Sequence, residues 1–200
     1  AAMSNYTAKP GLEGVVASDT AIAAVEQTGL SYRGYNIEDL ANNCHFEEVA
    51  HLLIFGELPS AGQLKEFNAL LADLRPLSGE LVAAIRSIPK DAPMMDVLRT
   101  GLSMAGHFDP VKGDDASDLR KRSVWLMAMA GAIVSVRYRM LEGGEPVEPK
   151  AGLSHAAQIL YQAQGVEPSA KAQKLLDLTL ILYAEHEFNA STFTARVIAS

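Results

Sequence analysis

Apolar residues recur with a helical period over most of the chain from Ile37 onward. Glycine and proline residues interrupt this period, and polar residues that favour helix N-caps precede several of the apolar stretches. The pattern predicts helices over residues 38–43, 46–55, 60–74, 80–87, 94–105, 115–141, 153–163, 169–184 and 192–200. Most of the chain is therefore predicted to be helical.

The segment before Ile37 has a different pattern. Short apolar runs at residues 15–17, 22–25 and 30–32 are separated by polar turn residues, which predicts two or three short strands. The predicted fold class is thus all-α with a short β-hairpin near the N-terminus. We expect residues 1–3 to be a cloning remnant and the start, residues 4–35 to form the hairpin segment, and residues 36–200 to form one helical domain.

Residues 123–136 form the longest uncharged stretch of the chain. At 14 residues the stretch is shorter than the ~20 residues that a bilayer-spanning helix needs, so no membrane segment is expected. Because the stretch is apolar all round, we expect both faces of this helix to be buried, which favours a partner subunit. Small residues along 94–106 and 115–141 predict close helix packing, either within the chain or between subunits.

Composition narrows the range of partners. The chain has 200 residues, 48% of them hydrophobic, which is enough for one sizeable core. Its formal net charge of −7 argues against nucleic acid as a partner, because binding phosphates requires a basic surface. A single cysteine, Cys44, leaves no disulfide within the chain and fits a reducing compartment, so we expect a cytoplasmic protein.

The strongest candidate chemistry lies at His186, between two predicted helices. Asn189 and Ser191 follow it and are good N-cap residues for the last helix. A helix N-terminus offers amide donors to an anion, and a histidine beside it adds a directional donor. The segment is thus a candidate anion-binding site, although a histidine with a purely structural role fits the same pattern.

Other motif interpretations are weaker. The zinc-protease motif His-Glu-x-x-His would need a histidine where Ala190 stands, and the remaining histidines lack ligand spacing, so no metal site is predicted. Arg33 could be a substrate arginine, or a structural arginine stacked on a tyrosine. His51 is expected to be an ordinary surface or interface histidine.

Several segments resemble the citrate synthase family, and most closely its 2-methylcitrate synthase branch. The run YAEHEFNASTFTARV at residues 183–197 resembles the family's histidine segment. YRGY at 32–35, FEEVA at 46–50 and GELP at 56–59 resemble its N-terminal block, and PMMDVLRTG at 93–101 resembles a third block. The resemblance spans roughly residues 11–200 and implies the family's multi-helix large domain.

The resemblance implies an acyltransferase of propionate metabolism or the tricarboxylic acid cycle. Such an enzyme condenses propionyl-CoA or acetyl-CoA with oxaloacetate, giving 2-methylcitrate or citrate and free CoA, and it uses no cofactor because acyl-CoA is a substrate. His186 and Asn189 would bind oxaloacetate, and Ser191 would support a catalytic histidine through hydrogen bonding. The family forms homodimers, which the resemblance places on helices 94–106 and 115–141.

The family's remaining catalytic segments, Gly-Pro-x-His-Gly and Gly-x-Gly-His, do not occur in this sequence. The last predicted helix also reaches Ser200 without a stop signal. We therefore expect the chain to be the N-terminal part of an enzyme, with its catalytic residues beyond Ser200, and to be inactive alone. The alternative is a non-catalytic helical dimerisation or ligand-binding module.

Overall fold

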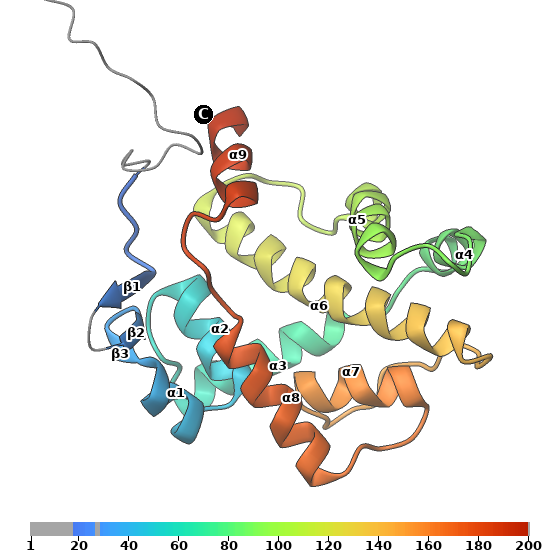
Figure 1. The fold of residues 1–200 in the computed structure, drawn as a ribbon, viewed down its shortest axis with the longest axis horizontal. Helices are drawn as coiled ribbons and strands as arrows, with labels where there is room; N and C mark the ends of the chain where they lie inside the picture. The colour runs from blue at the N-terminus through green and yellow to red at the C-terminus, as the bar shows by residue number, and fades with distance from the viewer. Residues whose placement is uncertain (1–17, 27–28, 200) are drawn as a thin grey trace, which may run out of the picture.

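Helix α6 (Ala116–Leu141) runs through the middle of the molecule, and other helices pack along it (Figure 1). The computed structural model describes residues 18–26 and 29–199. Within these residues α6 contacts α2, α3, α4, α5 and α7, so it is the helix around which the core is assembled. Val124, Ala128 and Ile133 on its inner face are almost completely buried.

The predicted helices are all present in the described part of the chain. Their bounds are α1 Ile37–Asn43, α2 Phe46–Phe55, α3 Ala61–Asp73, α4 Gly79–Ser87, α5 Met94–Ala105, α6 Ala116–Leu141, α7 His155–Gln164, α8 Ala170–Leu182 and α9 Ala190–Ala199, with a 3₁₀ turn at Gly106–Phe108. Serine or aspartate side chains accept a hydrogen bond from a first-turn amide at five starts: Ser60, Ser78, Asp115, Ser154 and Ser169. The N-cap signals in the sequence thus located these starts to within two residues.

A small antiparallel sheet precedes the helices. Strands β1 (Ala23–Glu26), β2 (Gly29–Tyr32) and β3 (Tyr35–Asn36) lie in the order β1-β2-β3, with Ala23 opposite Tyr32 and Tyr32 opposite Tyr35. Two of the predicted strands are thereby confirmed, whereas the predicted run at 15–17 lies outside the described residues. An all-α fold with a small N-terminal sheet is confirmed, and the division of the chain at residues 3 and 35 stays a prediction.

The chain by itself does not cover both faces of α6, so the burial of the second face by a partner subunit stays a prediction. Leu126 is 40% exposed, and half of the apolar window of α6 is buried. Among the described residues α6 alone is long and apolar enough to cross a membrane, and its packing is that of a core helix. The sequence correctly predicted that the residues of this stretch of α6 are apolar. It does not show which of them the other helices of the chain bury.

Two glycines allow the helices beside α6 to approach it closely. A Cβ placed on Gly101 of α5 would lie 2.8 Å from Cγ2 of Ile133, and one placed on Gly131 would lie 3.0 Å from Cγ1 of Ile159 on α7. Real Cβ atoms do not approach other carbons this closely at no cost. Packing within the chain therefore accounts for these two small residues.

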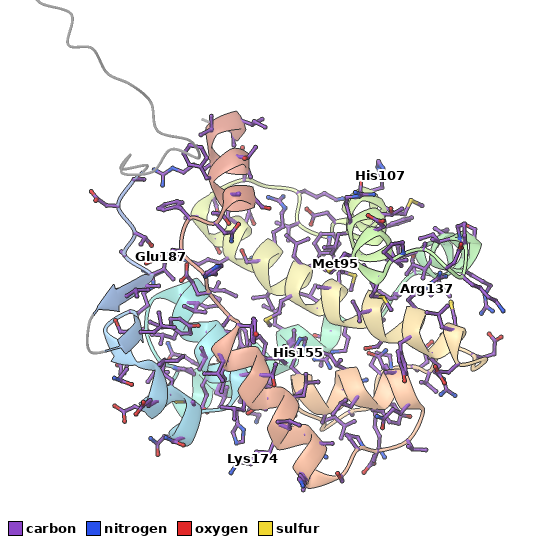
Figure 2. All side chains as sticks on the ribbon, in the orientation of Figure 1. Met95, His107, Arg137, His155, Lys174 and Glu187 are labelled. Atoms are coloured by element: carbon purple, nitrogen blue, oxygen red, sulfur yellow. The ribbon has the colours of Figure 1, made fainter. Side chains whose placement is uncertain are left out.

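A buried polar cluster joins α2, α3 and α7. The Glu47 carboxylate accepts the His155 backbone N–H at 2.5 Å, and Arg75 Nη2 lies 3.4 Å from His155 Nδ1. The Phe46 ring stacks on the imidazole at 5.4 Å between centroids. Burial lowers the pKa of His155 to about 3 and that of Arg75 to about 10. Figure 2 shows His155 in the interior of the fold.

Arg137 is a second buried cation, 2% exposed, on α6 (Figure 2). Its guanidinium donates to the carbonyl oxygens of Ile85 and Ile88, at 3.4 and 3.0 Å, and to that of Pro89. These carbonyls lie at and just beyond the end of α4, where the helix dipole is negative. Those of Ile85 and Pro89 also accept the N–H groups of Ile88 and Ala92, at 3.3 and 3.1 Å. Arg137 therefore stabilises the end of α4 against α6.

Candidate functional site

The candidate site is the loop of residues 183–189, which joins α8 to α9. Its conformation is fixed locally, because the Glu187 N–H donates to Glu185 Oε1 at 2.8 Å. Glu187 has φ of +51°, a left-handed conformation that few non-glycine residues adopt and that is often found at functional sites. His186 lies between these two residues and is exposed. Figure 2 shows Glu187 at the edge of the molecule, on the path from α8 to α9.

Tyr32 holds the other side of this loop from within the core. Its side chain is 0% exposed, and its hydroxyl lies 3.3 Å from Ile181 O, 3.4 Å from Leu182 O and 3.5 Å from Glu185 O. Burial raises the pKa of Tyr32, so the hydroxyl remains a proton donor to these carbonyls. The end of α8 and the residue immediately before His186 therefore share one buried contact.

Asn189 is the N-cap of α9. Its Oδ1 accepts from the N–H groups of Ser191 and Thr192, at 3.1 and 3.0 Å, while its carbonyl accepts from Phe193 N at 2.9 Å. The amides of Ser191 and Thr192 at the start of this helix are thus already paired with protein, unlike the free amides expected from the sequence. Any contact of the Asn189 side chain with an anion falls to its Nδ2 group.

Helix α9 itself is open to solvent along its described length. No residue of α9 within the described part is buried, and Ile198 is 80% exposed. The Arg196 guanidinium lies 5.2 Å from the centre of the Phe188 ring, a cation–π contact that links α9 back to the loop. Ser191, the predicted supporting residue, is exposed on the first turn.

An open cavity of about 420 Å³ lies beside the loop, between the sheet, α2 and the start of α6. It is lined by Ile22, Arg33, Leu53, Ile54, Leu119, Arg120, Ser123, Ala184 and Glu185. His186, Asn189 and Ser191 are not part of this lining, so the structure separates the predicted binding residues from the cavity. Arg33 Nε and Glu185 Oε2 are buried without a hydrogen-bond partner among the described residues.

Arg33 has a structural role. Its guanidinium donates to Leu53 O at 3.1 Å and to Ala21 O at 3.4 Å, which ties the sheet to α2. The partners that the structure gives are carbonyl oxygens and not a tyrosine ring, and a contact of Arg33 with substrate stays untested.

The expectation for His51 was wrong. This histidine is 5% exposed, with Nδ1 2.9 Å from Glu57 O and its ring stacked on Phe55. His51 lies on α2, a short helix with few polar positions, and on the side of α2 that packs against α3, so it is part of the core. In the described part of the chain, no three His, Cys, Asp or Glu side chains are grouped as they would be around a metal ion.

Sequence reasoning missed the role of Tyr32. Tyr32 is the one buried residue of β2, but its partner Ile181 is 149 positions away in the chain. No pattern within a short window can identify such a contact.

The family model described as "Citrate synthase, C-terminal domain" matches residues 11–200. A 2-methylcitrate synthase of Shewanella oneidensis is 42% identical over 194 residues, covering 95% of this chain and 51% of that protein. A citrate synthase of Heyndrickxia coagulans is 36% identical, covering 96% of this chain and 52% of its own length.

Solved structures agree with the sequence comparison. The citrate synthase of Thermotoga maritima has a TM-score of 0.84 at 34% identity, over 95% of this chain and 50% of its own. The enzyme of Thermoplasma acidophilum, solved with carboxymethyl coenzyme A and oxaloacetate, has a TM-score of 0.87 at 25% identity, over 94% of this chain and 50% of its own.

The chain thus spans about half the length of the curated relatives that it matches. The match extends from near the N-terminus through α9, and it includes the loop that carries His186. Family-model match, relatives and fold give the same assignment: this chain belongs to the citrate synthase family.

Proposed function

We propose that the protein containing this chain condenses an acyl-CoA with oxaloacetate, with propionyl-CoA accepted as well as acetyl-CoA. The observation that carries the choice of acyl donor is the ranking of relatives. Three 2-methylcitrate synthases are 42%, 42% and 41% identical to this chain, whereas three citrate synthases are 36%, 36% and 37% identical. Pocket discrimination by one methylene is worth ~1–3 kcal/mol, so use of both donors is physically reasonable.

The proposed reaction needs three kinds of group. A base removes a proton from the carbon next to the thioester carbonyl, a donor stabilises the enol oxygen, and positive or donor groups hold the dicarboxylate. The enol carbon then attacks the ketone of oxaloacetate, and water cleaves the thioester to release CoA. In this chain we assign only the holding of oxaloacetate, and we place the base beyond Ser200.

His186 and Asn189 are the proposed oxaloacetate ligands. His186 is exposed in a loop whose backbone is fixed on both sides, which suits a directional donor. The Nδ2 group of Asn189 is the remaining donor of a side chain whose oxygen already caps α9. Ser191, in the first turn of α9, is proposed to support a neighbouring catalytic histidine.

We further propose a cytoplasmic homodimer that uses no cofactor and binds neither nucleic acid nor membrane. Exposed apolar side chains on α5 and α6 support an interface on these helices: Met95 is 72% exposed, Leu126 40% and Tyr138 46%. The alternative is a non-catalytic helical module that has the family's fold without its activity. The amides at the start of α9 are paired within the chain and so give no argument against this alternative.

One experiment separates the two functions. The complete reading frame containing these residues is expressed, and release of the CoA thiol is followed with propionyl-CoA and with acetyl-CoA, in the presence and absence of oxaloacetate. We expect oxaloacetate-dependent release with both donors, and none from the 200-residue chain alone. A complete product that binds oxaloacetate but releases no thiol would favour the binding module.

A further inference from the structure

We propose that Tyr32 is a positioning residue for oxaloacetate binding, acting through the loop that carries His186. This inference rests on the proposed function. It adds a residue, more than 150 positions from His186 in sequence, to the set on which substrate binding depends.

The Tyr32 hydroxyl connects two parts of the backbone that would otherwise be independent. Ile181 and Leu182 belong to the last turn of α8. The Ile181 carbonyl also accepts the N–H groups of Tyr183 and Ala184 at the end of the helix. Glu185 lies beyond the helix end, one residue before His186. The hydroxyl has one proton to donate, and all three carbonyl oxygens lie within 3.5 Å of it. It therefore ties the end of α8 and Glu185 to one point, which sets where the loop leaves the helix.

Tyr32 comes from a firmly held element. It lies in β2, the central strand, with Ala23 opposite it on one side and Tyr35 on the other. The following residue, Arg33, donates to Leu53 O and so attaches the sheet to α2. The hydroxyl is therefore presented from a fixed frame rather than from a mobile side chain.

Helix α8 is attached to the same frame at a second point. Asp177 Oδ1 accepts the Phe46 N–H at 3.0 Å, and Asp177 Oδ2 lies 3.3 Å from His45 Nδ1, at the start of α2. The body of α8 is thus positioned without Tyr32. What depends on the hydroxyl is the end of the helix and the loop, so its loss should displace His186 and leave the rest of the fold in place.

Displacement of a binding group by a fraction of an ångström is sufficient to weaken ligand binding. We test this with Tyr32→Phe in the complete enzyme, because phenylalanine fills the same core volume and removes only the hydroxyl. The KM for oxaloacetate is expected to rise about three- to tenfold, the value of one neutral hydrogen bond, while the KM for the acyl-CoA stays unchanged.

The matched control is Tyr35→Phe, which removes a hydroxyl from the neighbouring strand at a residue that is 44% exposed. It should change neither KM. The decisive measurement is the double variant: in a His186→Ala background, Tyr32→Phe should no longer raise the oxaloacetate KM, because it acts through His186. Amide exchange of residues 183–188 should accelerate in Tyr32→Phe and not in Tyr35→Phe.

The outcomes are distinguishable. A wild-type protein without condensation activity contradicts the proposed function, while amide exchange in the loop still tests the effect of Tyr32 on it. An active enzyme in which Tyr32→Phe leaves the oxaloacetate KM unchanged overturns the inference. Equal effects with and without His186, or a Tyr32→Phe protein that does not fold, also overturn it, since Tyr32 would then act on the fold as a whole.

Discussion

Arg75 donates a hydrogen bond to Nδ1 of His155 across 3.4 Å, in a region where both side chains are about 95% buried. An arginine cannot accept, so Nδ1 must be the acceptor, and the neutral imidazole carries its proton on Nε2. Protonating Nδ1 would place two cations in contact with little water between them. Burial, with Arg75 as the second cause, accordingly lowers the pKa of His155 to about 3.

This relationship predicts a loss of stability in mild acid. An unfolded histidine has a pKa of about 6.5, so between pH ~6.5 and ~3 the unfolded chain binds a proton that the folded chain excludes. The free energy of unfolding should fall as pH is lowered through this window, with a slope approaching ~1.4 kcal/mol per pH unit. Urea unfolding at pH 7.5, 6 and 5 measures the slope. His155→Gln, which keeps an acceptor for Arg75, should show a shallower one; equal slopes would contradict this account.

Gly101→Ala should destabilise the α5–α6 packing. The new Cβ would lie 2.8 Å from Cγ2 of Ile133, so one of the helices must shift, at a cost of about 1–3 kcal/mol. Thermal unfolding measures it. The control is Gly62→Ala on α3, where a Cβ meets nothing within 4 Å and helix propensity should raise stability slightly. In an Ile133→Ala background the penalty of Gly101→Ala should largely disappear.

Two substitutions at Asn189 separate capping from substrate binding. Asn189→Ala removes the acceptor for the amides of Ser191 and Thr192 and should cost α9 about 0.5–2 kcal/mol. Asn189→Asp keeps the acceptor, so α9 should keep its protection in amide exchange. If Nδ2 contacts oxaloacetate, both variants raise its KM in the complete enzyme. A normal KM in Asn189→Asp would leave Asn189 as a cap alone.

Arg137→Met should destabilise the protein by about 1–3 kcal/mol, because the Ile88 carbonyl loses its donor, while those of Ile85 and Pro89 keep the N–H groups of Ile88 and Ala92. Chemical denaturation measures the change. Arg86→Met is the comparison: its ion pair with Glu145 lies on the surface, where solvent screens it, and its loss should matter much less. Similar effects of the two changes would show that the Ile88 carbonyl regains a partner from water.

His186→Ala in the complete enzyme should raise the oxaloacetate KM, by a loss of about 1.5–3 kcal/mol for one hydrogen bond to a charged ligand. Some fall in kcat is expected as well, since a displaced ketone weakens the attack geometry. The acyl-CoA KM should change much less. His186→Asn keeps a donor of similar reach without the ring and its charge, and should recover part of the loss. A lower Tm with unchanged kinetics would assign His186 a structural role.

Elements of this fold were predictable where the signal is local. Caps such as Ser60 and Asp115, and the glycine and proline residues between helices, gave the helix starts and ends. The family assignment also followed from short blocks, above all the one around His186. Asn189 was correctly expected at the start of α9. Its side chain, however, accepts hydrogen bonds from the amides that were expected to be free for an anion.

What could not be predicted depends on contacts between distant segments. Burial of His51 follows from how α2 meets α3, and nothing in its neighbourhood in the sequence distinguishes it from a surface histidine. Within the uncharged stretch of α6, the exposed Leu126 is as apolar as the buried Val124, so the sequence does not assign the two sides. The contact of Tyr32 with the loop joins residues near the two ends of the chain, so no local sequence pattern predicts it.

The contact between Tyr32 and Ile181 spans 149 positions, and those of Glu47 with His155 and of Phe46 with Asp177 span 108 and 131. During synthesis, the first strands and α2 therefore leave the ribosome long before α7 and α8 exist to cover them. Contacts of such high sequence separation form slowly, because a long loop must close before they are made. The strands and α2 thus keep apolar side chains uncovered until α7 and α8 have been synthesised. A chaperone that binds nascent chains would act on this segment.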